Sequence, residues 1–570
     1  MSTRDFEISE NASIKSKMEF DKKLSKLVDS KSRVLRITGS LCPDCVEEGK
    51  IKESKIDAVI YEKDGKVWMV KECPEHGIIN DLYWGDYDMY KKASKWLDPG
   101  LEIRNPQIKK ALNKISCPDD CGLCYLHKSH TGLGNIVVTN RCNLSCWYCF
   151  FYAKKGEAVY EPSLEQIRSM LRNMKNQKPI GTNAVQLTGG EPSLRKDIID
   201  IVKIARREGY DHIQFNTNGI RLSKDQKFVR DLRKANVTVI YMSFDGVTPE
   251  TNPKNYWEFP SALNNCKKVG QQVVLVPTVI GGVNDHELGD IITLAAGNID
   301  LIRSVNFQPV SLVGSMPHNQ RMKWRITCPD VCKKIEEQTD GQIGREDFFT
   351  IPVSTAITRF IEELTDQFKY RLSTHFACGL ATYVFVDGNQ LIPISRFMDV
   401  EGFFDCLNKL REKLQESKVK KIKKATSSLR LLWNIRKLID NSKKPDGLDI
   451  DKIITSALIE GNYNALREFH YKSLFIGMMH FMDLYNYDID RVQRCCIHYA
   501  TPDGRIIPFC AFNVIPQVFR DKTQKEFSTP AEEWEKKHKR KLKDDKYKRK
   551  LTERKKRKVK EFYDKFKVKK

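Results

Sequence analysis

Between residues 135 and 307, short runs of aliphatic and β-branched side chains alternate with longer stretches in which apolar residues recur at helical spacing. The apolar runs predict strands over 135–139, 184–187, 212–215, 237–242, 272–278 and 302–307. The longer stretches predict helices over 163–174, 195–207, 224–234, 260–268 and 285–296. Strands that alternate with amphipathic helices form βα units and a parallel sheet, so these units predict an α/β fold with a partial (β/α)6 barrel.

A cysteine-rich loop follows the first predicted strand. It places Cys142, Cys146 and Cys149 in a CxxxCxxC array. An iron–sulfur cube normally takes four cysteine ligands, so three thiolates leave one iron free for a small molecule. Ligands of parallel α/β sheets bind at the carboxyl ends of the strands, which is where this loop begins. A structural zinc site is the alternative for three isolated cysteines.

Polar and glycine-rich turns follow the later predicted strands. The segment LTGGEP contains Gly189, Gly190 and Glu191 directly after the second strand. Glycine lets the backbone approach a ligand closely, and a carboxylate can hold an amine. A turn or a helix cap explains each of the later polar side chains equally well when it is taken singly. The turns after strands three to five present Asn216, Asn218, Ser243, Asp245 and Thr278 on the same face.

A different kind of metal site is predicted near the N-terminus. Cys42 and Cys45 precede a predicted β-hairpin with a turn at residues 64–65, and Cys73 follows this hairpin. A CPxC turn, a hairpin and a further cysteine are typical of a zinc ribbon or a rubredoxin-like site, in which four soft ligands hold Zn or a mononuclear Fe. The fourth ligand remains open between His76 and a distant cysteine.

The remaining cysteine clusters predict auxiliary iron–sulfur sites. A second CxxxCxxC array has no strand before it, so it is expected to bind an auxiliary cluster, to complete the N-terminal metal site or to hold a structural zinc. A distal [4Fe–4S] site is expected where a hairpin at 501–504 brings distant cysteines together. Cys328 and Cys332, on a predicted helix, are interpreted as ordinary cysteines. The candidate auxiliary ligands are Cys117, Cys121, Cys124, Cys378, Cys495, Cys496 and Cys510.

Residues 401–490 are predicted to be mostly helical. Within them, residues 418–439 combine a basic face with an apolar face, which suits either a membrane surface or ordinary core packing. Residues 475–482 contribute Met478, Met479 and Met482. Methionine side chains adapt to irregular apolar surroundings, so these residues suit either a core or a lipid tunnel.

Size and cysteine content bound this picture. A chain of 570 residues, with 40% hydrophobic side chains, is expected to form two or three domains. No secretory signal and no membrane span of about 20 apolar residues is evident, so a cytoplasmic protein is expected, with at most peripheral contact at the inner membrane face. The 17 cysteines lie mostly in clusters. In a reducing compartment such clusters indicate metal ligands rather than disulfides.

Positive charge is concentrated at the C-terminus. The net charge is +23, and residues 531–570 carry 20 Lys and Arg against 8 Asp and Glu. Such a tail attracts polyanions or is simply a solvated terminus. It lacks the spaced aromatic residues of a base-stacking surface, so no specific nucleic acid is expected. The expected organisation is a polar arm at 1–33, an N-terminal metal-binding β domain at 34–130, the barrel at 131–312, a mostly helical C-terminal domain with an auxiliary cluster at 313–525 and the basic tail at 526–570.

The order of these motifs resembles that of radical S-adenosylmethionine (SAM) enzymes and, between residues 41 and 513, that of the archaeal tetraether lipid synthase group. The resemblance implies that SAM completes the three-cysteine [4Fe–4S] cluster, that Tyr148 faces the adenine, and that auxiliary [4Fe–4S] clusters and a rubredoxin-like Fe or Zn are present. Trp147, Phe150 and Phe151 are bulkier than the residues often found in that group. The segments that carry the resemblance are CPDC, CPEHG, CPDDCGLC, TNRCNLSCWYCF, QLTGGEPSLR, THFACG and CCIHYATPDGRIIPFC.

The resemblance also implies a function. A deoxyadenosyl radical would abstract hydrogen so that terminal methyl carbons of the isoprenoid chains of archaeal ether lipids become joined. The implied partners are an archaeal ether phospholipid substrate and an electron donor such as ferredoxin or flavodoxin. The alternative enzyme function is radical SAM methylation of a pterin or similar heterocycle, which predicts a small polar pocket. A nucleic-acid-binding metalloprotein is the non-catalytic alternative, and it leaves the GGEP turn and the three-cysteine loop unexplained.

Overall fold

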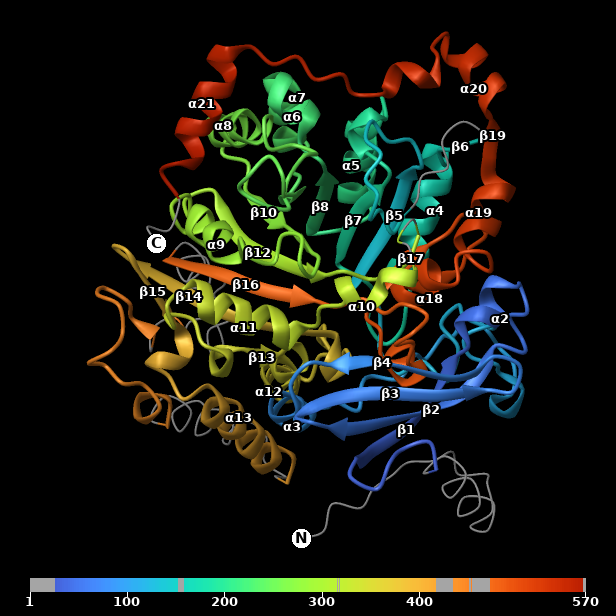
Figure 1. Ribbon diagram of the computed structural model, residues 1–570, viewed down its shortest axis with the longest axis vertical. Coiled ribbons are helices and arrows are strands. Elements are labelled where there is room, and N and C mark those ends of the chain that lie inside the picture. Colours follow the sequence, from blue (N-terminus) through green and yellow to red (C-terminus); the bar gives the residue numbers. More distant parts are fainter. Residues whose placement is uncertain are drawn as a thin grey trace.

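The computed structural model describes residues 26–151, 158–314, 316, 318–416, 434–450, 453 and 472–566. Figure 1 shows these residues coloured from blue at the N-terminus to red at the C-terminus. A four-stranded sheet lies near the N-terminus, and a large mixed sheet forms the centre of the molecule. Most of the predicted polar arm and most of the predicted helix at 418–439 lie outside the described residues.

Antiparallel strands form the N-terminal sheet, in the order β1-β2-β3-β4. The predicted hairpin is β2 and β3, and its turn uses Asp64 and Gly65 at φ values of 53° and 71°. Glycine tolerates this left-handed conformation without a steric penalty, which makes such pairs favourable in tight hairpins. The elements of this domain are β1 (Arg33–Leu41), α2 (Pro43–Glu47), β2 (Lys55–Lys63), β3 (Lys66–Cys73), β4 (Gly77–Trp84) and α3 (Tyr87–Ser94).

Parallel strands form the centre of the large sheet, in the spatial order β16-β12-β10-β9-β8-β7-β5. The helices between them bury apolar side chains in the core, for example Ile167 and Leu171 of α4. The elements are β5 (Leu133–Thr139), β6 (Ala158–Tyr160), α4 (Leu164–Lys175), β7 (Ala184–Gly189), α5 (Ile198–Arg207), β8 (His212–Thr217), α6 (Ile220–Lys224), α7 (Gln226–Lys234), β9 (Val239–Ser243), α8 (Phe259–Val269), β10 (Val273–Val276), β11 (Thr278–Val279), α9 (Leu288–Ala296) and β12 (Ile302–Pro309).

The predicted α/β barrel class is confirmed, and the elements differ from the predicted ones mainly at their ends. The strand predicted over 272–278 is divided into β10 and β11 at Pro277. Proline has no N–H to donate to a neighbouring strand, which explains the break. The helix predicted over 224–234 is α7, and a separate short helix, α6, precedes it.

The prediction that residues 401–490 are mostly helical is wrong for β16 (Ser473–Met479). This strand lies parallel to β12, with Ser304 opposite Phe475, and Figure 1 shows the two side by side. A short apolar run does not reveal by its spacing whether it is a buried strand or a buried helix. The helical prediction does hold for α13 (Val400–Gln415).

The C-terminal half of the chain completes both edges of the large sheet. Strands β14 and β13 extend it beyond β16, and β17 and β18 extend it beyond β5. The remaining elements are α10 (Arg321–Trp324), α11 (Cys328–Gln338), β13 (Phe349–Thr350), α12 (Thr355–Thr365), β14 (Gly379–Asp387), β15 (Gln390–Pro393), α17 (Ile489–Gln493), β17 (Ile497–Ala500), β18 (Ile506–Pro508), α18 (Phe509–Val514) and α19 (Arg520–Phe527).

The basic tail folds back onto the barrel. Strand β19 (Ser528–Pro530) pairs with β6, and α20 (Ala531–His538) and α21 (Glu553–Tyr563) follow along the rim that is red in Figure 1. Trp534 and Tyr563 of these helices are buried. Residues 531–566 therefore pack against the barrel and do not form the solvated terminus that was one of the two interpretations of the sequence. Among the described residues, no helix has the length and apolar character needed to cross a bilayer.

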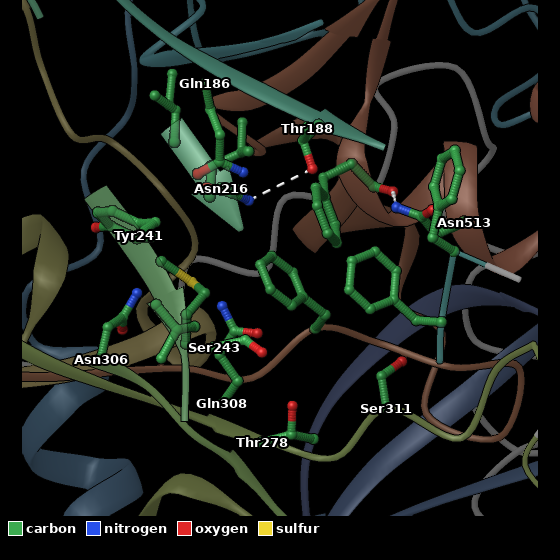
Figure 2. A pocket seen from close by; sticks show the side chains of 18 of the residues that line it. Gln186, Thr188, Asn216, Tyr241, Ser243, Thr278, Asn306, Gln308, Ser311 and Asn513 are labelled. Atoms are coloured by element: carbon green, nitrogen blue, oxygen red, sulfur yellow. Dashed lines mark hydrogen bonds between the residues drawn. The ribbon is translucent and has the colours of Figure 1, made fainter. Parts of the chain in front are cut away.

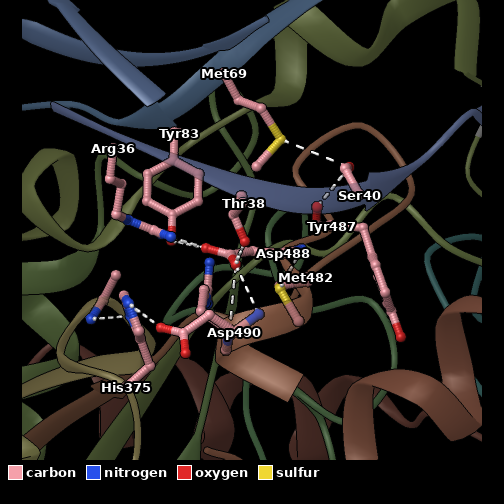
Figure 3. Close-up of polar contacts among 12 residues, drawn as sticks. Arg36, Thr38, Ser40, Met69, Tyr83, His375, Met482, Tyr487, Asp488 and Asp490 are labelled. Atoms are coloured by element: carbon pink, nitrogen blue, oxygen red, sulfur yellow. Dashed lines mark hydrogen bonds and ion pairs between the residues drawn. The ribbon is translucent and has the colours of Figure 1, made fainter. Parts of the chain in front are cut away.

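Buried ion pairs join the N-terminal sheet to the segment that follows β16. Figure 3 shows Arg36 of β1 paired with Asp488, whose side chain is fully buried. Although burial opposes ionisation, the Arg36 guanidinium holds the pKa of Asp488 well below its usual range. Arg325 makes a second junction, at 3.0 Å from Asp81 of β4 and 2.5 Å from Asp483. Buried charges need partners, so each junction ties the two domains together.

Candidate functional site

A cavity of about 590 Å³ opens at the carboxyl ends of the parallel strands. The cysteine loop after β5 lies on one side of it, and β16 and α18 contribute the opposite side. Ligand sites of α/β sheets commonly occupy this position. The residues predicted from sequence that line the cavity are Cys142, Cys146, Tyr148, Cys149, Gly189, Gly190, Glu191, Asn216, Asn218, Ser243 and Thr278.

The cysteine loop places three half-buried thiols on this cavity. Burial raises the pKa of Cys142 to about 12, and burial also raises the pKa of Cys146. A metal cluster overcomes such a shift because coordination deprotonates a thiol outright. Three soft donors beside open space fit an iron–sulfur cube that takes its remaining ligand from a small molecule.

The GGE turn after β7 lies directly against the cysteine loop. The Gly190 N–H donates to the Thr139 carbonyl at 2.8 Å, and the Glu191 N–H donates to the Arg141 carbonyl at 2.7 Å. A Cβ atom on Gly190 would lie 2.2 Å from that Arg141 carbonyl oxygen. The position therefore requires glycine, and the turn and the loop form one unit.

The Glu191 carboxylate holds the ends of β7 and β8 together. It accepts hydrogen bonds from the Thr217 hydroxyl at 2.8 Å and from the backbone N–H groups of Asn218 at 2.8 Å and Ser193 at 3.1 Å. Burial raises the pKa of Glu191, although these hydrogen bonds oppose the shift. The binding of an amine by this carboxylate remains a prediction, because the described contacts commit it to the protein scaffold.

A buried charged triad lies beside the cysteine loop. Tyr148 donates its hydroxyl to Asp245, and the Lys254 ammonium lies 2.6 Å from the same carboxylate. Asp245 also accepts the Thr278 N–H at 3.0 Å. Lys254 lines the cavity, and its charge acts to lower the pKa of Cys146 against the effect of burial. The sequence interpretation missed Lys254, because this residue lies in a loop without a motif. Asp245, which the sequence did predict, is not itself among the residues that line the cavity.

Polar amides form one wall of the cavity, as Figure 2 shows. Gln186 donates to Asn135 at 2.9 Å, which fixes its orientation. The side-chain oxygens of Gln214 and Asn216 are buried and have no hydrogen-bond partner among the described residues. An unpaired buried acceptor costs free energy, so these atoms are suited to a ligand with N–H donors. The wall comprises Gln186, Gln214, Asn216, Tyr241, Asn306 and Gln308.

Apolar side chains form another part of the cavity lining. They come from β16, from the segment that follows it, and from α18. Met478, Met479 and Met482, noted in the sequence, are among them, and Met478 and Met482 are also buried in the core. An apolar wall excludes water from the side of the cavity that faces the amides. Its members include Phe475, Met478, Met479, Phe481, Met482 and Phe509.

The N-terminal metal site is a compact group of four ligand atoms, all within 4.8 Å of one another. The His76 Nδ1 atom lies 3.5 Å from the Cys42 sulfur, 3.4 Å from that of Cys45 and 3.5 Å from that of Cys73. Burial alone would raise the pKa of Cys73, but hydrogen bonds from His76 and the backbone lower it to about 7. The structure thus indicates that His76, rather than a distant cysteine, is the fourth ligand. A set of three cysteines and one histidine suits a mononuclear ion.

A carboxylate supports this site from outside. The His76 Nε2 atom lies 3.1 Å from Glu48, whose carboxylate raises the pKa of His76 together with the Cys73 thiol. Such a contact fixes the ring orientation of a ligating histidine. None of the four ligands lines the central cavity, so the two metal sites are separate.

The second CxxxCxxC array is directed toward the C-terminal cysteines. Burial raises the pKa of Tyr487, and the thiols of Cys117, Cys121, Cys510 and Cys495 reinforce the shift. The Tyr487 hydroxyl is buried without a partner among the described residues. Cys117, Cys121, Cys510 and Tyr487 belong to one buried cluster and Cys495 packs against it, so these four thiols suit an auxiliary cluster. The array does not complete the N-terminal site, which has four ligand atoms of its own.

The other candidate cysteines lie at the margins of this group. Burial raises the pKa of Cys124, Cys378 and Cys496. The Cys117 thiol raises the pKa of Cys124 further, and the Cys378 thiol raises that of Cys496. Cys496 and Cys510 also line the central cavity. Cys328 and Cys332 are buried in the apolar core, in agreement with their interpretation as ordinary cysteines.

Comparison with known proteins identifies two regions of the chain. Residues 136–295 match the family model described as the radical SAM superfamily, and residues 34–85 match the HMPTM N-terminal zinc ribbon domain. The curated 7,8-dihydro-6-hydroxymethylpterin dimethyltransferase of Methanocaldococcus jannaschii is 45% identical over 512 residues, which cover 88% of this chain and 97% of the relative.

More distant proteins share the radical SAM region. The GTP 3',8-cyclase of Peptoclostridium acidaminophilum is 24% identical over 299 residues, 49% of this chain and 89% of that relative. The crystal structure of a radical SAM methyltransferase from Sphaerobacter thermophilus matches 56% of this chain and 77% of its own, at 11% identity and a TM-score of 0.25. That structural similarity is too remote to bear on function.

These comparisons confirm part of the sequence interpretation and correct another part. The radical SAM assignment is confirmed, and with it a [4Fe–4S] cluster, SAM and a mononuclear metal site as cofactors. The expected lipid substrate and the joining of isoprenoid chains are contradicted, because the relative that spans 88% of the chain is named as a pterin dimethyltransferase. The heterocycle alternative is therefore the better supported one.

Proposed function

The chain belongs to the radical SAM family that contains the 7,8-dihydro-6-hydroxymethylpterin dimethyltransferase of Methanocaldococcus jannaschii, and we propose that it methylates a reduced pterin. The observation that carries this proposal is 45% identity over 97% of that relative. An alignment of this extent is much longer than the radical SAM region of residues 136–295, so the similarity extends well beyond that region. The proposed substrate is therefore a small heterocycle.

The amide wall of the cavity supports this substrate class. A pterin carries an amino group, ring N–H groups and a carbonyl along one edge. Among the described residues, the side-chain oxygens of Gln214 and Asn216 are buried acceptors without a hydrogen-bond partner. Gln186 and Gln308, labelled in Figure 2, add further amides. A site that hydrogen-bonds such an edge rejects analogues that lack it, because its own polar groups would be left unpaired.

The chemistry of the substrate named for the relative fits two methylations. Such a pterin has a ring methylene carbon and a hydroxymethyl carbon, and both carry aliphatic C–H bonds. A cavity of about 590 Å³ lies within the usual range for small-molecule sites of about 300–1,000 Å³. We place the ring edge against the amides and the aliphatic carbons toward the cysteine loop.

When bound, the [4Fe–4S] cluster with SAM supplies a carbon radical able to abstract an aliphatic hydrogen. Cys142, Cys146 and Cys149 would hold that cluster at the cavity. Lys254 contributes a buried positive charge, which favours the thiolate form of Cys146 and the binding of the carboxylate group of SAM. The apolar wall of β16 and α18 excludes water, which strengthens the polar contacts that hold a ligand in the cavity.

We assign the auxiliary cluster to Cys117, Cys121, Cys495 and Cys510. The support for this grouping is that Cys117, Cys121 and Cys510 are buried in one cluster with Tyr487, and that Cys495 packs against this cluster. Cys510 also lines the cavity, which places this cluster close to the substrate. A low-potential donor such as ferredoxin or flavodoxin is the expected source of electrons.

An anaerobic assay of the reconstituted enzyme with 7,8-dihydro-6-hydroxymethylpterin, a reductant and SAM tests the proposal. SAM is in excess, so that one molecule supplies the radical and a second donates its methyl group and leaves as S-adenosylhomocysteine. A parallel reaction adds a reduced one-carbon carrier as the donor. Mass spectrometry is expected to show pterin with one and then two added methyl groups. Cys142→Ser should abolish this product. An enzyme that cleaves SAM to deoxyadenosine but leaves the pterin unchanged would refute the proposal.

A matched pair of variants tests the amide wall. Gln214→Leu removes a buried acceptor from the cavity, whereas Gln367→Leu alters an exposed glutamine elsewhere. The first change is expected to raise KM for the pterin about tenfold, the effect of losing one hydrogen bond of about 1.4 kcal/mol. The second should leave KM unchanged. Equal KM values for both variants would show that Gln214 does not take part in substrate recognition.

A further inference from the structure

The C-terminal tail contacts the residues on both sides of Cys142. We call residues 531–566 the C-terminal strap; it runs along the barrel rim from α20 to α21, in red in Figure 1. Arg141 contacts its first half, and Asn143 contacts its middle. A cluster ligand thus lies between two residues that a remote part of the chain holds in place.

Arg141 is buried at the first contact. Its guanidinium lies 2.7 Å from the Asp545 carboxylate and 2.9 Å from that of Glu161, and it lies 4.5 Å from the centre of the Trp534 ring. Trp534 also donates its indole N–H to Glu161 at 3.0 Å. Charge-assisted hydrogen bonds in a buried position fix geometry strongly, because no water can replace a lost partner.

Asn143 makes the second contact. The Tyr547 N–H donates to the Asn143 carbonyl at 3.0 Å, and the Tyr547 hydroxyl donates to Glu258 at 2.8 Å. Arg549 pairs with the same buried carboxylate at 3.0 Å. The Asn143 side chain in turn accepts from Asn218 at 2.7 Å. This part of the strap therefore reaches the polar turn after β8 through the cysteine loop.

The backbone of Arg141 transmits the first contact to the GGE turn. Its carbonyl accepts the Glu191 N–H at 2.7 Å and lies where a Cβ of Gly190 would be. A shift of Arg141 would displace Cys142 and this turn together. Both line the cavity, so a movement of the strap would change the site without any strap residue lying among the lining residues.

We propose that the C-terminal strap sets the position of Cys142 and of the GGE turn, and that Asp545 is a positioning residue that acts through Arg141. The strap is thus part of the cluster-binding apparatus, whatever substrate the cavity takes. Its many basic residues then serve the fold in part, since Arg549 neutralises the buried Glu258. This assignment differs from a tail that only binds polyanions.

Hydrogen exchange of residues 139–149 in the reconstituted enzyme tests the proposal without reference to turnover. Asp545→Asn keeps the shape of the side chain but removes its charge, and exchange in this segment should become about tenfold faster. Asp544→Asn alters the exposed neighbouring residue and should leave exchange at the wild-type rate. Asp545→Glu retains a carboxylate and should restore much of the protection.

The electron paramagnetic resonance spectrum of the reduced, SAM-bound cluster supplies the second readout. Asp545→Asn should change this spectrum, because it reports the geometry around the iron atoms, whereas a purely structural tail would leave it unchanged. Trp534→Phe keeps the ring over Arg141 but removes the donor to Glu161, and it serves if Asp545→Asn fails to fold. Wild-type exchange and a wild-type spectrum in the folded variant would overturn the proposal.

Discussion

At the scale of single residues, the chemistry of the cavity depends on a buried charge pair of which the sequence indicates only one member, Asp245. Lys254 and Asp245 form a pair that is almost wholly removed from solvent, and Tyr148 donates to the same carboxylate. Removing one partner of such a pair leaves an uncompensated charge, which typically costs about 3–5 kcal/mol. The geometry beside Cys146 therefore depends on all three residues.

Lys254→Met is expected to weaken SAM binding to the reconstituted enzyme about tenfold, since it removes a positive charge from the cavity and releases Asp245. Equilibrium dialysis with labelled SAM measures this change. Lys267→Met is the matched control, because Lys267 forms an exposed pair with Asp300. Unchanged SAM affinity in Lys254→Met would mean that this charge has no part in the site.

His76→Ala should release the metal of the N-terminal site, because it deletes one of four ligands. Elemental analysis of the purified protein is expected to show the loss of one Zn or Fe per chain. His76→Cys preserves a soft ligand and should retain the ion. His286→Ala changes an exposed histidine and should have no effect. Full metal content in His76→Ala would mean that another group, and not His76, supplies the fourth ligand.

From the sequence, those residues could be predicted whose spacing is characteristic of a particular kind of site. The cysteine loop and the GGE turn could be predicted because three thiols or two glycines have few other uses in such patterns. Asp545 could not, because its partner Arg141 is far away in the chain, and Lys254 could not, because it lies in a loop without a motif. His76 was one of two candidates, and only the folded hairpin brings its ring to the three sulfur atoms.

At the scale of elements, β16 shows where the apolar pattern becomes ambiguous. Its run of apolar residues continues beyond the strand, so it lacks the clear alternation of a strand with one exposed face. The burial pattern reveals two environments: Leu474 and Ile476 are fully buried in the core, whereas Phe475 and Met479 line the cavity. One strand thus serves both stability and substrate contact.

Two substitutions should separate these environments. Ile476→Ala removes buried core volume and is expected to lower the free energy of unfolding by about 2–5 kcal/mol. Phe475→Ala enlarges the cavity and should raise KM for the substrate, with a smaller loss of stability. Thermal unfolding and steady-state kinetics on both variants measure the difference. Similar stability losses with equal KM values would contradict the proposed division of the strand.

At the scale of the whole molecule, the barrel holds its additional segments through buried polar contacts. The N-terminal sheet docks through Arg36 and Asp488 (Figure 3), and the strap docks through Arg141 and Asp545. His130 makes another link, since its Nε2 atom accepts the Arg371 N–H at 2.9 Å. These contacts join segments that lie hundreds of residues apart, and they determine how the molecule responds to pH.

Acid should destabilise the protein in part through His130. Burial lowers the pKa of His130 to about 4, from an ordinary value of about 6.5 in the unfolded chain. The unfolded state therefore binds more protons, so stability falls as pH drops from about 6.5 toward 4, by about 1.4 kcal/mol per pH unit. A protonated ring could also no longer accept the Arg371 N–H.

His130→Gln keeps an acceptor but does not titrate, so its unfolding midpoint should depend less steeply on pH between about 6.5 and 4. Anaerobic thermal unfolding at several pH values compares it with the wild type. The exposed His286→Gln variant should retain the wild-type dependence. Parallel pH curves for the wild type and His130→Gln would show that His130 does not titrate between the two states.

The order of the barrel elements could be predicted because strands and helices in βα units have distinct local periods. Strand β16 and the strap could not, because both return to the barrel from the C-terminal part of the chain. Nothing local to residues 531–566 distinguishes a docked strap from a solvated basic tail. The buried Trp534 and Tyr563 become informative once their partners, Arg141 and Tyr256, are known.

Hydrogen transfer from the substrate tests the central claim most directly. The reconstituted enzyme would receive SAM, reductant and 7,8-dihydro-6-hydroxymethylpterin deuterated at its ring methylene and hydroxymethyl carbons. The account predicts that deuterium appears in deoxyadenosine and that the same pterin molecules gain methyl groups. Deoxyadenosine free of deuterium would contradict the account, as would deuterium acquired from a labelled isoprenoid ether lipid in place of the pterin.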